Sequence, residues 1–200
     1  MRVTFPRLPD RQRGYALVER DDWAAYRLYG GKAGPQLPHD LMHFVVEREL
    51  CIPDGIWGGI AAGVIFDTME HAGGRRPPHA RERSKELLAD FGRRGLRAEV
   101  LASFVGCVAM LDHPSDIQIL NLAATQLAAL PDEDADVDPA AVAAAAQALQ
   151  VEAARWARLR VGEELSYEWP QTPPSQARRA RARKPRIVRP YKKRTGRRPA

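Results

Sequence analysis

The first 30 residues alternate between apolar and polar positions in the way that β-strands do. The alternation covers three segments, at residues 2–5, 14–20 and 23–29. The turn-forming pair Asp21-Asp22 separates the last two segments, and the glycine-rich stretch 30–35 ends the pattern as a loop. This stretch lacks the GK[ST] ending and the helix context of a phosphate-binding loop. The pattern therefore predicts a small antiparallel sheet over residues 1–30.

Residues 37–163 carry apolar residues at helical spacing, which predicts a helical body of four or five helices. Pro38 suits the first turn of a helix, because its missing N–H costs nothing there. The first helix should therefore run from Pro38 to about Cys51. Further helical material is expected over residues 56–66, 80–91, 98–111, 117–130 and 139–160. Glycines at 73–74 and 92–95 are expected to interrupt it.

Residues 165–170 alternate again, and they predict a strand that returns to the N-terminal sheet. The expected fold class is α+β and mainly helical, with the small sheet packed against the helical body. We expect a single globular domain over residues 1–170, followed by a basic tail over residues 171–200.

The apolar content of 44% fits a globular protein. The longest apolar stretch, residues 56–66, is far shorter than the roughly 20 residues needed to cross a bilayer. Cys51 and Cys107 lie in separate apolar runs with neither a CxxC spacing nor a secretory leader, so we expect buried, reduced thiols. These features predict a cytoplasmic protein without a transmembrane segment.

The charge is divided unevenly along the chain. Residues 178–200 contain 12 Arg or Lys and no acid, whereas the preceding 177 residues contain 19 basic and 25 acidic residues. A segment so charged cannot bury enough apolar surface to offset the entropy of ordering, so the tail should be disordered alone. The net charge of +6 therefore combines an acidic body with a strongly basic tail.

The basic tail predicts contact with DNA or RNA, because Arg and Lys neutralise phosphates and release counterions. Tyr191 adds a ring that can stack on a base. The residues expected to contact nucleic acid are Arg178, Arg179, Arg181, Arg183, Lys184, Arg186, Arg189, Tyr191, Lys192, Lys193, Arg194, Arg197 and Arg198. Attraction to the acidic body, contact with anionic lipid and simple solubilisation are the alternatives.

The segment 38–47 places four ionisable side chains within an otherwise apolar helix. His39, Asp40, His43 and Glu47 fall on one arc of about 100° at helical geometry. Histidines four residues apart present two imidazole nitrogens to one zinc ion. The resulting HDxxH pattern resembles the HExxH of zinc peptidases, so Asp40 is the candidate general base, although its side chain is shorter than the expected Glu.

A zinc site also needs a third protein ligand. Glu47 lies on the same arc, and Glu70 or His71, near the expected end of the second helix, are the alternatives. Two other interpretations stay open. His43 could act as a base held by the neighbouring carboxylates, or the four groups could form a polar seam without any catalytic role.

The string LPHDLMHFVVE and the later GIWGGIAAG resemble a segment of uncharacterised bacterial proteins of actinobacterial type, over roughly residues 36–66. The resemblance implies a recurring two-helix unit and carries no activity. Because clustered charge is a broader signal than one pair of histidines four residues apart, the chain is expected to be a non-enzymatic binding protein whose basic tail contacts nucleic acid. The alternative is a zinc-dependent hydrolase that uses the HDxxH helix.

Overall fold

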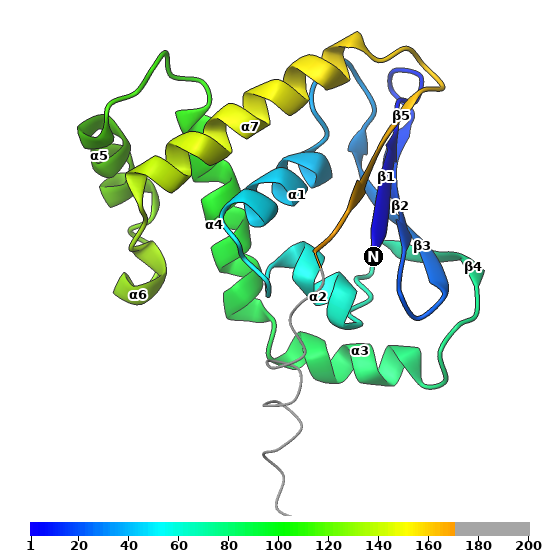
Figure 1. Ribbon diagram of the computed structural model, residues 1–200. Coiled ribbons are helices and arrows are strands. Elements are labelled where there is room, and N and C mark those ends of the chain that lie inside the picture. The colour runs from blue at the N-terminus through cyan, green and yellow to red at the C-terminus, as the bar shows by residue number, and fades with distance from the viewer. Residues whose placement is uncertain (171–200) are drawn as a thin grey trace, which may run out of the picture.

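The computed structural model describes residues 1–170 and contains a five-stranded antiparallel sheet in the order β4-β3-β2-β1-β5. The helices gather on one side of this sheet (Figure 1). The strands are β1 Arg2–Pro6, β2 Arg13–Glu19, β3 Ala24–Lys32, β4 Met69–Gly74 and β5 Glu164–Glu168. The α+β, mainly helical class is confirmed, and the basic tail lies outside the described residues.

The return strand predicted over residues 165–170 is confirmed as β5. It pairs with β1 in antiparallel register, with Val3 opposite Tyr167, so the two ends of the described chain lie side by side. One face of the sheet is apolar and buried, and it includes Val3, Val18 and Leu28. The alternation seen in the sequence therefore marks the face on which the helices pack.

Strand β4 was not predicted, because residues 69–74 were expected near the end of a helix that began at residue 56. That helix, α2 (Ile56–Ala62), ends early, since Gly63 takes a φ of 121° that favours glycine. At the far end of β4, Gly74 has a φ of 71°, and any Cβ there would lie 1.9 Å from the Trp23 carbonyl oxygen. Glycine is thus required where the edge strand passes closest to the β2–β3 turn.

The described chain has seven helices, where four or five were expected. They are α1 His39–Glu49, α2 Ile56–Ala62, α3 Ala80–Ala89, α4 Gly92–Val108, α5 Asp116–Gln126, α6 Asp132–Ala135 and α7 Pro139–Arg158. The break expected at residues 92–95 lies instead at residues 90–91, between α3 and α4, and α4 includes residues 92–95. Its Gly95 leaves room for the Phe91 ring, which would lie 2.7 Å from an added Cβ. Ser115 caps α5 and Asp138 caps α7.

Helix α1 lies between two hydrophobic clusters. Its Phe44 packs edge-on against Phe5 of the sheet and Trp57 of α2, with ring centroids 6.0 and 5.4 Å apart. Its Val46 belongs to the second cluster, which α1 forms with α4, α5 and α7. A helix buried on both sides leaves little water for its polar side chains. Those side chains must therefore find partners within the protein.

Neither cysteine is buried as expected. Cys51 is exposed in the turn after α1, where its φ is 51°, and Cys107 near the end of α4 is half-buried. Both are free thiols. Among residues 1–170, no helix combines the length and apolar character required for a membrane span.

Candidate metal centre

Helix α1 places two imidazoles one turn apart, and α4 brings a carboxylate to them. The Glu99 Oε2 atom lies 3.2 Å from His43 Nε2 and 3.8 Å from His39 Nε2. The two histidine rings have centroids 4.5 Å apart. His39 and Glu99 are exposed, whereas the His43 side chain is only 3% exposed. The cluster therefore opens to solvent on one side and is closed on the other.

The spacing of these atoms is compatible with one tetrahedral ion. Ligand atoms that lie about 2.0–2.1 Å from a tetrahedral zinc ion are about 3.3 Å from one another. The two distances from Glu99 lie on either side of this value. Among residues 1–170, His39, His43 and Glu99 form the one group of three His, Cys, Asp or Glu residues whose candidate ligand atoms all lie within 4.8 Å.

His43 is held between two carboxylates. On its other edge, Nδ1 lies 3.7 Å from Glu47 Oε1, an ion-pair contact that is too long for a hydrogen bond. Within residues 1–170, neither ring nitrogen has a partner with good hydrogen-bond geometry. Burial opposes charging of the ring, but Glu47, Glu99 and Asp40 outweigh it and raise the pKa of His43. A buried imidazole without hydrogen bonds requires an explanation.

Glu47 is the most deeply buried acid of this region, and it caps helix α2. Its Oε1 and Oε2 accept the backbone N–H groups of Ile56 and Trp57, each at 3.0 Å. An added Cβ at Gly55 would lie 2.5 Å from Glu47 Oε2, so only glycine admits the carboxylate at this position. Burial raises the pKa of Glu47, opposed by His43 and these N–H donors. Glu47 therefore contacts His43 from the side opposite Glu99.

Asp40 points to the sheet rather than to Glu47. Its carboxylate lies against the backbone of Gly30 in β3, where an added Cβ would be 2.4 Å from Oδ2. Burial raises the pKa of this carboxyl, while His39 and His43 oppose the increase. Asp40 and His39 line the same cavity, of about 390 Å³, which runs along residues 30–38. Tyr15 and Lys32 also line it.

The structure brings some of the predicted site residues together and separates the others. His39 and His43 come together, Asp40 lies beside them at the cavity, and Glu47 reaches only His43. Glu70 and His71 lie on the edge strand β4 instead of a helix, and the His71 ring packs on Tyr26 with centroids 5.6 Å apart. Neither belongs to the group of three.

Glu99 was missed in the sequence. It follows Ala98, where a helix was expected to begin, and an acid in a first turn is common for electrostatic reasons alone. Its position beside the histidines depends on how α4 packs across α1, and the sequence pattern around Glu99 does not predict that packing.

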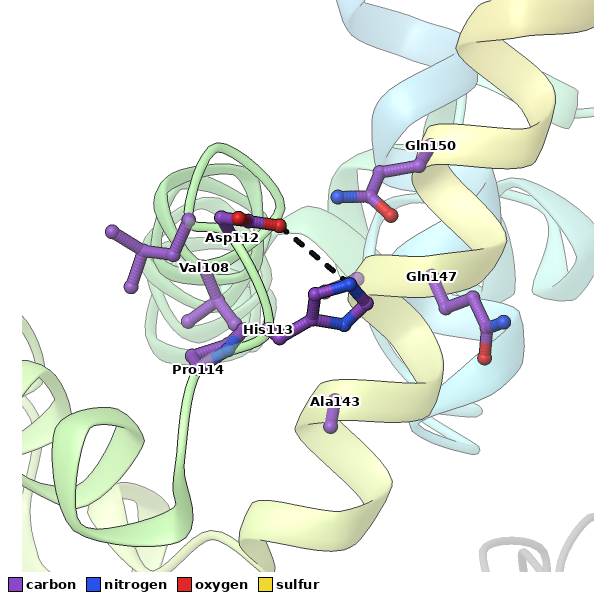
Figure 2. A pocket seen from close by; sticks show the side chains of 9 residues that line it. Val108, Asp112, His113, Pro114, Ala143, Gln147 and Gln150 are labelled. Atoms are coloured by element: carbon purple, nitrogen blue, oxygen red, sulfur yellow. Dashed lines mark ion pairs between the residues drawn. The ribbon is translucent and has the colours of Figure 1, made fainter.

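A larger cavity, of about 470 Å³, lies between the end of α4 and α7. Figure 2 shows His113 and Asp112 at its edge, facing Gln147 and Gln150 on α7. His113 Nε2 is 3.6 Å from Asp112 Oδ1, and both side chains are almost fully exposed, at 98% and 99%. Apart from Asp112 and His113, no acidic residue, cysteine or histidine is among the residues that line this cavity. It therefore offers volume without a ligand set.

Comparisons with protein-family models, with curated proteins and with solved structures found no match for the chain.

Proposed function

We propose that this protein binds a divalent transition-metal ion, most naturally zinc, through His39 Nε2, His43 Nε2 and a Glu99 carboxylate oxygen. Two imidazoles and one carboxylate are a ligand set of catalytic zinc, which keeps a further position open for water or substrate. Neutral imidazole also suits other late first-row metals, but the absence of a thiolate disfavours softer ones. The exposed side of the cluster gives an ion a route from solvent.

The observation that carries the proposal is the convergence of a second imidazole, His39, and a carboxylate, Glu99, on the buried imidazole of His43. An ordinary surface ion pair would leave His43 hydrated, whereas this ring is 3% exposed and lacks a well-aligned partner within residues 1–170. A metal ion would satisfy its Nε2 lone pair. It would also compensate the charge of Glu99, which comes from a different helix.

The same geometry supports metal-dependent hydrolysis as the activity. A bound zinc ion lowers the pKa of its water to about 7 and polarises a carbonyl or phosphoryl oxygen. Asp40 is the candidate proton acceptor, because its carboxylate lines the cavity beside His39. Its raised pKa brings it nearer to neutrality, where a general base works best. The cavity along residues 30–38 is the candidate substrate site.

Metal analysis of protein purified without an affinity tag tests the binding step. We expect about one zinc ion per chain, lost in His39→Ala and retained in the matched variant His113→Ala. Wild-type protein that contains no metal and fails to take up added zinc would overturn the proposal.

Hydrolysis is tested separately with zinc-loaded protein on ester, amide and phosphoester substrates. Asp40→Asn should retain zinc and lose turnover by about 100-fold or more, because the amide cannot accept the proton. Turnover at the wild-type rate in Asp40→Asn, or no turnover on any of the three classes, would refute the hydrolytic step while leaving metal binding intact.

We also propose, as a second function, that the basic tail contacts DNA or RNA. The supporting observation is the segregation of charge, with 12 basic residues and no acid over residues 178–200. Binding should weaken steeply as salt is raised and should disappear on truncation after Gln176. Equal binding by the full-length and truncated proteins would contradict this proposal.

A further inference from the structure

We infer that Glu47 is a positioning residue that holds His43 in the tautomer whose Nε2 lone pair faces the metal ion. This inference rests on the proposed metal function. It assigns to Glu47 a role other than that of a ligand, and it makes the start of α2 a part of the metal centre.

The first argument is the arrangement of the imidazole. Glu47 Oε1 faces Nδ1 at 3.7 Å, and Glu99 Oε2 faces Nε2 at 3.2 Å, so the two ring nitrogens have different neighbours. A neutral imidazole carries one N–H, and a metal-bound nitrogen must be the unprotonated one. A proton on Nδ1 faces the negative charge of the Glu47 carboxylate, an ion-pair contact that favours this protonation. The opposite tautomer would place the N–H where the ion binds.

The second argument is that Glu47 is itself immobilised. The Glu47 side chain has no exposed surface, and its two oxygens accept the N–H groups of Ile56 and Trp57 at 3.0 Å. Gly55 adds a steric limit, since any Cβ there would meet the carboxylate. An ionised carboxylate can accept about four hydrogen bonds, so the two backbone donors leave part of its acceptor capacity free beside Nδ1.

The third argument is the contact between Trp57 and the N-terminal end of α1. The indole Nε1 donates to the Asp40 carbonyl oxygen at 3.2 Å, while the Trp57 backbone N–H donates to Glu47. Helix α2 therefore contacts α1 at both ends of the segment that carries His43. Partners that orient a metal-bound histidine in this way raise its basicity and fix the direction of its ring.

A purely structural role is the competing explanation, because Glu47 also caps α2. That role predicts a loss of stability and no change in the affinity of the folded protein for metal. The positioning role predicts a loss of affinity even where the variant is fully folded.

The decisive experiment compares Glu47→Gln with Glu152→Gln. Glu152 is the matched control, because it is also buried and hydrogen-bonded, to Tyr167 and Arg155, and belongs to neither the metal cluster nor the α2 cap. Zinc affinity is measured by competition with a chelator, and the visible spectrum of the cobalt-loaded protein reports the coordination geometry. We expect Glu47→Gln to bind zinc about 10–100-fold more weakly, with an altered cobalt spectrum, and Glu152→Gln to bind like the wild type.

Folded Glu47→Gln with wild-type zinc affinity and an unchanged cobalt spectrum would overturn the inference, while leaving the metal site itself established. Wild-type protein that binds neither zinc nor cobalt would instead refute the proposed function. The two failures are therefore distinguishable.

A second measurement needs no substitution at Glu47. Nitrogen NMR of histidine-labelled, zinc-loaded wild-type protein distinguishes a protonated ring nitrogen from a metal-bound one. We expect His43 to show a protonated Nδ1 and a metal-bound Nε2. Coordination through Nδ1 would contradict the inference even if Glu47→Gln failed to fold.

Discussion

Two groups that combine histidine and carboxylate lie along and just beyond helix α4, and only one of them has the features of a functional site. At the middle of α4, Glu99 faces His43 and His39, which come from helix α1. Just beyond the end of α4, Asp112 and His113 are neighbours in sequence and almost fully exposed. The second pair borders the larger cavity (Figure 2). Burial and convergence of separate elements therefore distinguish a candidate site better than cavity volume does.

Of the substitutions that test this comparison, removal of the buried His43 imidazole should have the largest effect on zinc affinity. His43→Ala deletes the ligand that both helices hold in place, so zinc affinity should fall by more than about 100-fold. Isothermal titration with zinc measures the change, and circular dichroism verifies the fold. If folded His43→Ala bound zinc with nearly wild-type affinity, the buried cluster would have no more claim to be a metal site than the exposed pair Asp112 and His113.

A smaller loss is expected when the carboxylate is changed and both imidazoles remain. Glu99→Gln keeps a neutral oxygen at the same place but loses the charge, which should weaken zinc binding by about 10–100-fold. Asp112→Asn is the same chemical change in the exposed pair beyond α4 and should leave affinity unchanged. Equal effects of the two substitutions would indicate a general electrostatic cause rather than ligation.

The pH dependence of zinc binding should report the protonation of His43 in the buried cluster. In the metal-free protein, the surrounding carboxylates raise the pKa of His43, so the ring is protonated up to a higher pH than an ordinary histidine. A proton on His43 competes with zinc, so affinity should fall as the pH decreases, beginning above the usual histidine value of about 6.5. Zinc titrations at a series of pH values measure this. Affinity that is flat from pH 8 to about pH 5 would contradict it.

A modest loss of stability is expected from a substitution at Gly30, where the Asp40 carboxylate lies against the sheet. The added methyl group of Gly30→Ala would lie 2.4 Å from the Asp40 carboxylate and should displace it, at a cost of about 1 kcal/mol in unfolding free energy. Chemical denaturation measures this cost, and zinc affinity should stay unchanged because Asp40 is not a ligand. Zinc loss in Gly30→Ala would instead place Asp40 among the ligands.

The smallest effect on stability and zinc binding is expected from a substitution in the exposed pair, Asp112 and His113. His113→Ala should change the unfolding free energy by less than about 0.5 kcal/mol and leave zinc binding unaltered. A metal loss in this variant would show that the exposed pair, rather than the buried one, holds the ion.

Local patterns in the sequence predicted the parts of the fold that depend on neighbouring residues. Alternation identified the sheet and its return strand β5, and the helical spacing of His39 and His43 placed two imidazoles together. Strand β4 was not predicted, because its residues include two glycines and lack an alternating apolar pattern. They join the sheet through long-range pairing with β3. The edge strand of the sheet therefore could not be predicted from the pattern of neighbouring residues.

The site was predictable only to the extent that one helix forms it. The HDxxH helix was recognisable, but the carboxylate that lies near both histidines is Glu99, for which no role was expected, and not Glu47. Glu47, on the same arc, is held by the backbone of α2, and Glu99 reaches the histidines from α4. Both outcomes depend on how helices pack, which the spacing of residues within α1 does not determine.

Anomalous diffraction at the zinc edge from crystals of the zinc-loaded protein tests the central claim most directly. We predict a single strong peak between α1 and α4, about 2.0–2.2 Å from His39 Nε2, His43 Nε2 and a Glu99 oxygen. A peak elsewhere on the protein, such as beside His113, or no peak between these helices, would contradict the assignment of the metal centre.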